Sequence, residues 1–152
     1  YLRMDVIEVA GATGGQDTDE IAIARAVVDA LATHDFVLAN IKAPDLGGHD
    51  GNCGMKMEAI AKVDRALAHI LEHVDFARTT LMITADHCTP CSVEDHSGDA
   101  VPVAFFGYGV RPDDVERYGE RPCGKGIMGH LRGMEIMQVL TNMMGRGEKF
   151  GA

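Results

Sequence analysis

Two loops rich in potential metal ligands, each directly after a short apolar run, constrain this chain more than any other feature. The apolar run 36–41 leads into the first loop, and the run 80–84 leads into the second. Such runs are typical of buried strands, and α/β sheets usually place their active sites beyond the carboxyl ends of strands. We therefore expect the two loops to meet in space. The candidate ligands that they carry are Asp45, His49, Asp86, His87 and His96.

The order of apolar patterns along the chain predicts an α/β fold. Helical spacing of apolar residues is found over 20–33, 57–73 and 131–144. Short apolar runs predict strands over 4–9, 35–41, 79–85 and 101–106. The polar segment 111–121 predicts a short helix or turns, and Asp17 or Thr18 is expected to cap the first helix. This order favours a mostly parallel sheet with helices on both faces. No repeat or linker divides residues 1–152, so one domain is expected.

The balance of charge limits the classes of partner. The 152 residues include 14 basic and 23 acidic side chains, which give a formal net charge of −9. This excess of negative charge argues against nucleic acid or an anionic membrane as the partner. The sequence has neither an apolar run of membrane-spanning length nor a signal peptide, so we expect a cytoplasmic protein. Because it begins without Met and close to the strand-like segment 4–9, we expect it to start inside a larger fold.

Carboxylate and imidazole side chains after successive strands predict metal binding. Asp45 and His49 are four residues apart, so they share a face if their loop forms a helical turn. Two histidines and one carboxylate with open positions are a usual catalytic metal set, and a pair of divalent ions can clamp a phosphoryl group during transfer. Five ligands are too many for one catalytic zinc and too few for two closed sites. We therefore expect further ligands from residues elsewhere or from a substrate.

A second interpretation uses the thiols. Cys88 and Cys91 form a C-x-x-C pair, which is typical of a redox pair or of half of a structural zinc site. Cys53 and Cys123 would supply the other half of such a site. A thioredoxin-like pair opens a helix, whereas this pair lies in a loop that contains Pro90. The carboxylate and imidazole site is therefore the preferred interpretation, and the thiol site stays open as an alternative.

Three motifs carry a resemblance to a known family. They read Ala-Pro-Asp-x-x-Gly-His-Asp-Gly at 43–51, Thr-Ala-Asp-His-x-Thr-Pro-Cys at 84–91 and Asp-His-Ser-Gly-Asp-x-Val-Pro-Val at 95–103. The segments 11–18 and 149–152 fit the same pattern. In combination these motifs are specific, and the whole chain resembles the archaeal-type cofactor-independent phosphoglycerate mutases of the alkaline phosphatase superfamily.

This resemblance implies an isomerase of glycolysis and gluconeogenesis that moves a phosphoryl group between the 3- and 2-positions of glycerate through a phosphoserine. It implies two divalent metal ions, Mn²⁺, Zn²⁺ or Mg²⁺, that activate the serine and stabilise charge on the phosphoryl group. By the same resemblance, Asp45, His49 and His96 would hold one ion, and Asp86 and His87 the other. The implied fold is alkaline phosphatase-like, and it is incomplete at the amino terminus of this chain.

Several positions depart from the family pattern. The family's serine nucleophile and one further metal-binding Asp lie in an amino-terminal segment that precedes the residues present here, and neither Ser92 nor Ser97 fits the place of the nucleophile. Cys88 stands where the family usually has Ser, Asn40 where it often has His, and Ile23 where it often has Lys. We therefore expect a carboxyl-terminal portion that is inactive without its amino-terminal portion and that self-associates through exposed apolar surface. The alternatives are another superfamily hydrolase of phosphate or phosphonate esters and a metal-binding module without catalysis.

Overall fold

The computed structural model describes residues 3–147, which divide into two compact units. The first unit contains the described residues up to Val74 together with the segment Thr89–Ser97. The second contains Asp75–Cys88 and the described residues from Gly98 onward. The candidate ligands are therefore distributed over both units. Asp45, His49 and His96 belong to the first, and Asp86 and His87 to the second.

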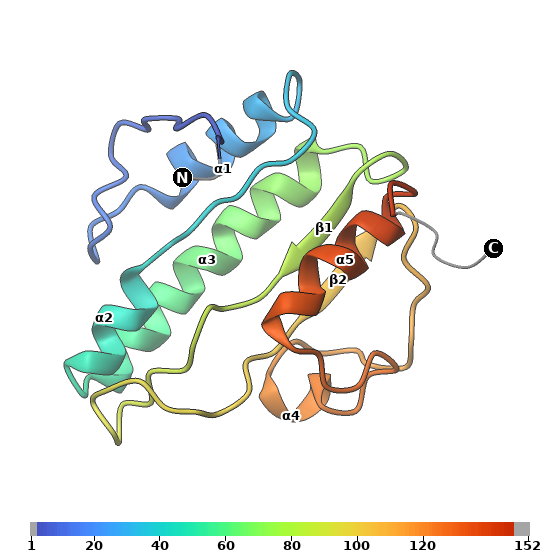
Figure 1. The fold of residues 1–152 in the computed structure, drawn as a ribbon. Coiled ribbons are helices and arrows are strands. Elements are labelled where there is room, and N and C mark those ends of the chain that lie inside the picture. The colour runs from blue at the N-terminus through green and yellow to red at the C-terminus, as the bar shows by residue number, and fades with distance from the viewer. Residues whose placement is uncertain (1–2, 148–152) are drawn as a thin grey trace. The chain divides into compact units, whose positions relative to one another are not determined.

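Three helices build the first unit: α1 (Glu20–Ala30), α2 (Ala43–His49) and α3 (Cys53–His73). The long helix α3 packs against both α1 and α2, as Figure 1 shows. Asp19 begins α1, because its carboxylate accepts hydrogen bonds from the backbone N–H groups of Ile21 and Ala22. Asn52 begins α3 in the same way by accepting from the N–H of Met55. Both α1 and α3 thus start where a side chain satisfies the first unpaired backbone donors of the helix.

Small side chains and one ionic cluster join α1 to α3. Ala24 on α1 and Ala59 and Ala66 on α3 are buried, and such small residues let two helix backbones approach closely. Beside them, the carboxylate of Glu20 lies 2.8 Å from Nε of Arg65 and 3.7 Å from Nζ of Lys62. A backbone hydrogen bond and then these two cations lower the pKa of Glu20 from its ordinary value.

Two short strands and two helices build the second unit. The strands β1 (Thr80–Ile83) and β2 (Ala104–Gly107) pair antiparallel, with Thr80 opposite Gly107 and Ile83 opposite Ala104. The helix α5 (Gly133–Met143) packs on β1, and α4 (Glu120–Cys123) is a single turn. The phenol of Tyr118 donates a hydrogen bond to the carbonyl of Pro102, and burial raises its pKa to about 12.

The predicted α/β class is correct, but the predicted parallel sheet is not confirmed. Residues 4–9 and 35–41 form no strand, and the two strands present among residues 3–147 are antiparallel neighbours. A strand requires a hydrogen-bonded neighbour as well as an apolar pattern, and the described residues offer these two segments none. The predicted strands 79–85 and 101–106 are found as the shorter β1 and β2.

Helix boundaries differ from prediction for identifiable local reasons. The helix predicted over 57–73 starts four residues earlier because Asn52 caps it. Asp19 caps α1 in place of Asp17 or Thr18, because the Asp17 carboxylate instead accepts a hydrogen bond from the hydroxyl of Thr13. The helices predicted over 20–33 and 131–144 are present as α1 and α5. Residues 149–152, which contribute to the resemblance, lie outside the described residues.

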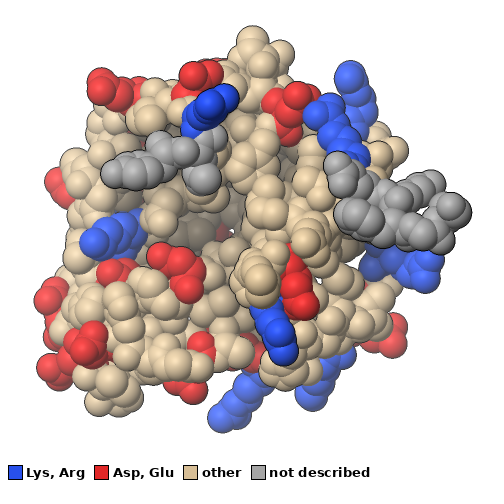
Figure 2. Space-filling model, viewed as in Figure 1, with Lys and Arg blue, Asp and Glu red and all other residues tan. Residues whose placement is uncertain are grey.

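Acidic charge is concentrated in the sequence of the first unit. Its segments carry fourteen acidic and six basic residues, a net charge of −8, whereas those of the second carry nine and eight, a net charge of −1. Figure 2 shows side chains of both signs spread over the face in view. The first unit therefore offers the more favourable field for a cation. None of the helices in the described part of the chain combines the length and apolar character needed to cross a membrane.

Candidate metal centre

Three candidate ligands meet within the first unit. Asp45 and His49 project from successive turns of α2, and His96 comes from the segment Thr89–Ser97. Nε2 of His49 lies 3.5 Å from Oδ1 of Asp45 and 3.2 Å from Nε2 of His96. Nε2 of His96 lies 3.7 Å from the same carboxylate oxygen. The side chains are 20 % (Asp45), 37 % (His49) and 50 % (His96) exposed, so the cluster faces an open side.

These spacings fit one metal ion. Ligand atoms about 2.1 Å from a tetrahedral ion stand about 3.4 Å from one another. The three distances among Asp45 Oδ1, His49 Nε2 and His96 Nε2 span 3.2–3.7 Å and bracket this value. Two imidazoles and one carboxylate also match the ligand types of catalytic sites that keep a position for water or substrate. The donor set therefore suits a divalent ion with one side open.

The hydrogen bond at the far side of His49 sets its tautomer. Nδ1 of His49 lies 3.1 Å from the backbone carbonyl oxygen of Glu94, which can only accept. In the neutral imidazole, Nδ1 therefore carries the hydrogen and Nε2 presents a lone pair to the cluster. Glu94 has a φ of 58°, in the left-handed region that non-glycine residues seldom adopt. This strained turn directs the Glu94 carbonyl at the imidazole.

Two adjacent glycines give α2 its close neighbours. A Cβ on Gly47 would lie 2.7–2.9 Å from backbone and Cβ atoms of Lys56 on α3. A Cβ on Gly48 would lie 2.9 Å from Cβ and Cγ2 of Thr89, and closer still to its carbonyl oxygen. No side chain fits in either place, so only glycine lets α3 and the Thr89 segment pack on the backbone of α2.

Sequence reasoning missed two residues that this packing brings to the cluster. The hydroxyl of Thr89 donates a 2.6 Å hydrogen bond to Oδ1 of Asp45. Nζ of Lys56 donates a 2.6 Å hydrogen bond to the carbonyl oxygen of Thr89. A threonine in a loop has no distinctive sequence pattern. The available signal was the glycine pair inside a helix, which indicates a close backbone approach.

Asp86 and His87, the other two predicted ligands, follow β1 in the second unit. Nε2 of His87 lies 3.5 Å from Oδ2 of Asp86, so the two side chains face one another. Their assignment to a second ion stays a prediction.

The four cysteines, all within residues 3–147, form no disulfide bond. In the first unit, the thiol of Cys91 donates to the carbonyl of Gly47 at 3.7 Å and interacts with the thiol of Cys53. Burial and then Cys53 raise the pKa of Cys91 from its ordinary value. In the second unit, the thiol of Cys88 donates to the carbonyl of Ala100 at 3.8 Å. The alternative of a thiol-based site stays a prediction.

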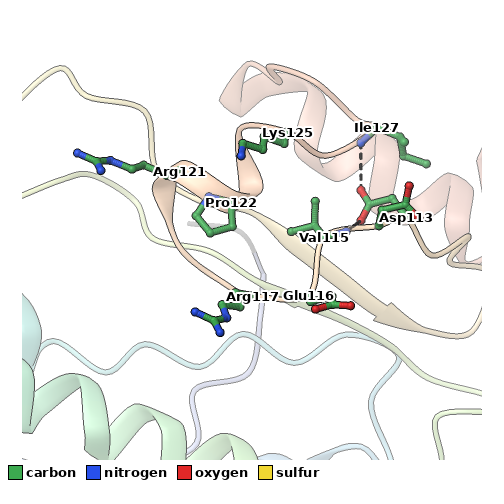
Figure 3. A pocket seen from close by; sticks show the side chains of 9 residues that line it. Asp113, Val115, Glu116, Arg117, Arg121, Pro122, Lys125 and Ile127 are labelled. Carbon is green, nitrogen blue, oxygen red and sulfur yellow. Dashed lines mark hydrogen bonds between the residues drawn. The ribbon is translucent and has the colours of Figure 1, made fainter.

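The second unit also has a hollow of about 460 Å³ at its surface, shown in Figure 3. Asp113 holds its wall together, because its two carboxylate oxygens accept from the N–H groups of Val115 at 2.9 Å and Ile127 at 3.0 Å. These hydrogen bonds lower the pKa of Asp113. Charges of both signs balance around the hollow, which is lined by Asp113, Asp114, Glu116, Arg117, Arg121 and Lys125.

Comparisons with known proteins place this arrangement in a family. The chain is 47 % identical over 151 residues to a 2,3-bisphosphoglycerate-independent phosphoglycerate mutase of Thermococcus gammatolerans. It is 43 % identical to 2,3-bisphosphoglycerate-independent phosphoglycerate mutase 1 of Methanocaldococcus jannaschii. Each match covers 99 % of this chain but only 37 % of the relative.

A solved structure of a related protein has a similar fold. The structure of the PH0037 protein from Pyrococcus horikoshii matches 97 % of this chain with a TM-score of 0.95 and 45 % identity, and the match covers 45 % of that protein. The model of the family described as the metalloenzyme superfamily matches residues 1–143. Together with the ligand cluster, this match supports binding of a divalent metal ion. The chain therefore belongs to the metalloenzyme superfamily.

Proposed function

We propose that this chain is the carboxyl-terminal, metal-binding portion of a phosphoglycerate mutase that interconverts 3-phosphoglycerate and 2-phosphoglycerate. The observation that carries the proposal is the cluster of Asp45, His49 and His96, whose spacing suits one divalent ion. Two further observations support it: membership of the metalloenzyme superfamily and 43–47 % identity to relatives that bear the name of this enzyme. The chain spans only 37 % of their length, so the activity of the whole enzyme belongs to the proposal.

In this proposal Asp45, His49 and His96 hold one ion, and Asp86 and His87 hold a second. Mn²⁺, Zn²⁺ and Mg²⁺ are the candidates. When bound, such ions lower the pKa of an attacking oxygen and neutralise charge on a phosphoryl group. The chain's own residues prepare the site. The Glu94 carbonyl keeps the lone pair of His49 on Nε2, and the open side of the cluster leaves room for a phosphoryl oxygen of the substrate.

The proposed nucleophile is a serine outside this chain. Neither Ser92 nor Ser97 is assigned that role, so the phosphoserine intermediate requires a further portion of the protein. Two exposed apolar side chains support such a portion. Val6 is 89 % and Leu38 is 66 % exposed, and both lie in segments that form neither helix nor strand among residues 3–147. A second portion that adds strands beside these segments would cover them.

The proposal also places the protein in the cytoplasm. It assigns the remaining exposed apolar surface to self-association when the second portion is absent. Light scattering at concentrations used for crystallisation checks the self-association. A single monomeric species at these concentrations would contradict it.

Elemental analysis of the purified chain tests the metal site. We expect stoichiometric Mn or Zn in the wild type and its loss in His49→Ala and in His96→Ala. His73→Ala is the matched control, because Nδ1 of His73 contacts the carbonyl of His69 within its own helix. Full metal content in all three variants would remove the proposed centre.

Enzyme assays test the remaining part of the proposal. We expect no mutase turnover by the 152-residue chain and turnover by a longer protein that adds a serine-bearing amino-terminal portion. Mutase turnover by the 152-residue chain would refute the assignment of the nucleophile. Hydrolysis of a phosphate or phosphonate ester by the longer protein, without mutase turnover, would favour another hydrolase of this superfamily.

A further inference from the structure

We propose that Thr89 is a positioning residue for the metal ligand Asp45, and that Lys56 holds Thr89 in place. This inference rests on the proposed metal centre. The Thr89 hydroxyl donates at 2.6 Å to Oδ1 of Asp45. The same oxygen faces Nε2 of His49 at 3.5 Å and Nε2 of His96 at 3.7 Å. The oxygen that Thr89 holds is therefore the one that completes the ligand triangle.

A carboxylate needs such a partner to present one oxygen reliably. The last torsion of Asp is broad and roughly two-fold, so an unrestrained carboxylate exchanges its two oxygens. An O–H···O hydrogen bond to a charged acceptor is short and strong, and 2.6 Å is within its usual range. An ionised carboxylate oxygen can accept this bond and still bind an ion, because it offers more than one lone pair. The hydroxyl therefore fixes Asp45 without occupying its binding position.

Burial protects the hydrogen bond between Thr89 and Asp45 from water. Thr89 is only 4 % exposed, so water has little access to replace its hydroxyl. Its methyl group lies against Gly48, where a Cβ would approach Cγ2 of Thr89 to 2.9 Å. The methyl contact on one side and the hydrogen bond on the other define the orientation of the side chain.

Lys56 fixes the position of the Thr89 backbone. Its Nζ donates at 2.6 Å to the Thr89 carbonyl, and its backbone packs against Gly47. Lys56 thus connects α3 to the beginning of the segment that also carries His96. A charged donor makes this hydrogen bond stronger than one between neutral groups. The two bonds, Lys56 to Thr89 and Thr89 to Asp45, link α3 to a ligand on α2 through a loop from a distant part of the chain.

Isothermal titration calorimetry with Mn²⁺ tests this role. Thr89→Val keeps the shape of the side chain but removes the hydroxyl, whereas Thr89→Ser keeps the hydroxyl. We expect the first to weaken Mn²⁺ binding about 10- to 100-fold, the usual effect of losing a partner of a metal ligand, and the second to stay within about 3-fold of wild type. Thr80→Val is the matched control, because the Thr80 hydroxyl donates at 2.7 Å to the carbonyl of Tyr108 in the second unit. It should bind Mn²⁺ as wild type does.

A second pair of variants applies if Thr89→Val fails to fold. Lys56→Met should weaken Mn²⁺ binding several-fold, whereas Lys62→Met, which removes a similar bond from Nζ to the Thr18 carbonyl, should not. Far-UV circular dichroism in chelator shows which variants fold. This readout separates a loss of metal affinity from a loss of structure.

The outcomes separate this inference from the proposed function. Equal affinities in wild type and Thr89→Val would overturn the positioning role but leave the metal centre intact. Weaker binding in Thr89→Ser than in Thr89→Val would also overturn it, because the methyl contact would then matter more than the hydroxyl. Absence of Mn²⁺ binding in the wild type would overturn both the metal centre and the inference.

Discussion

Replacing Gly48 by alanine tests whether close packing on α2 controls the metal cluster. The new Cβ would lie 2.9 Å from Cβ and Cγ2 of Thr89 and closer still to its carbonyl oxygen. Real Cβ contacts essentially never fall below 3.0 Å, so either α2 or the segment Thr89–Ser97 must move. Part of the obstruction is backbone, which cannot turn aside as the end of a long side chain does. The displacement would act directly on the hydrogen bond from Thr89 to Asp45.

Two opposing effects set the size of the change. Alanine is favoured over glycine inside a helix by about 1 kcal/mol. Overpacking in a well-packed region costs about 1–3 kcal/mol, and an obstruction by backbone belongs in the upper half of that range. We therefore expect G48A to lower the free energy of unfolding by about 1–2 kcal/mol. For a chain of this length this corresponds to a fall in Tm of about 2–8 °C.

Gly54→Ala is the matched control for this substitution. Gly54 also lies in a helix, but its Cβ would meet only Oδ1 of Asn52, at 3.5 Å. Only the higher helix propensity of alanine then changes the stability, and G54A should be more stable than wild type by up to about 1 kcal/mol. Urea unfolding in chelator measures both variants, and a calorimetric titration with Mn²⁺ should show weaker binding only in G48A. If G48A matched G54A in stability and bound Mn²⁺ as wild type does, the packing argument would be wrong.

Three further predictions concern groups whose pKa is shifted. We expect Glu20→Gln to cost about 1 kcal/mol of stability at pH 7 and less at pH 3. A backbone hydrogen bond and Arg65 lower the pKa of Glu20 in the folded state. The contribution of Glu20 to stability is therefore present above the unfolded-state pKa and is lost as pH falls through the folded-state pKa. Urea unfolding at both pH values checks this. In a spectrophotometric titration at 295 nm, one phenol should ionise near pH 12 and be missing in Tyr118→Phe, because burial raises its pKa to about 12. Iodoacetamide at pH 8 should modify Cys91 more slowly than the exposed Cys53, because burial raises the pKa of Cys91; equal rates in peptide mass spectra would contradict this.

Helices with an apolar stripe could be predicted because their pattern and their contacts are local. The stripe over 20–33 predicts α1 and the one over 57–73 predicts α3, each within a few residues. The sequence predicts the short helix α2 only as a conditional helical turn, because Pro44 and two glycines obscure the helical pattern. The strands predicted over 4–9 and 35–41 are wrong for a different reason. An apolar pattern predicts an extended segment but carries no information about the neighbour that would pair with it.

Candidate ligands could be proposed from the sequence because ligand chemistry limits the residue types. The i, i+4 spacing of Asp45 and His49 became meaningful once α2 formed, and the predicted meeting of His96 with them is observed within the first unit. Thr89 could not be predicted in the same way. Its partner Asp45 lies 44 residues away, and a threonine hydroxyl serves many structural roles. The role of this hydroxyl becomes visible in the structure, where the packing at Gly48 brings Thr89 to Asp45.

Two candidate ligands, Asp45 and His49, lie on α2, so the geometry of the candidate metal centre depends on tertiary structure. This helix has seven residues, includes two glycines and has no side-chain hydrogen bond at its amino-terminal cap. A helix this short is not stable by itself, because nucleation is costly and each glycine adds about 1 kcal/mol. Its shape must therefore come from its neighbours. Gln16 donates to the Ala43 carbonyl at 2.7 Å, and Lys56 and Thr89 contact its glycine face.

The same contacts that form α2 therefore bring Asp45 and His49 to His96. In the unfolded chain these ligands are separated, so an ion that binds the cluster binds the folded state preferentially and stabilises it. The close contacts at Gly47 and Gly48 also show why this short helix contains residues that weaken it. Alanine at Gly47 or Gly48 would strengthen the isolated helix, but it would displace the neighbours that hold the ligands in place. The glycines thus lower the local stability of α2, and the arrangement of the candidate metal ligands depends on the close packing that they allow.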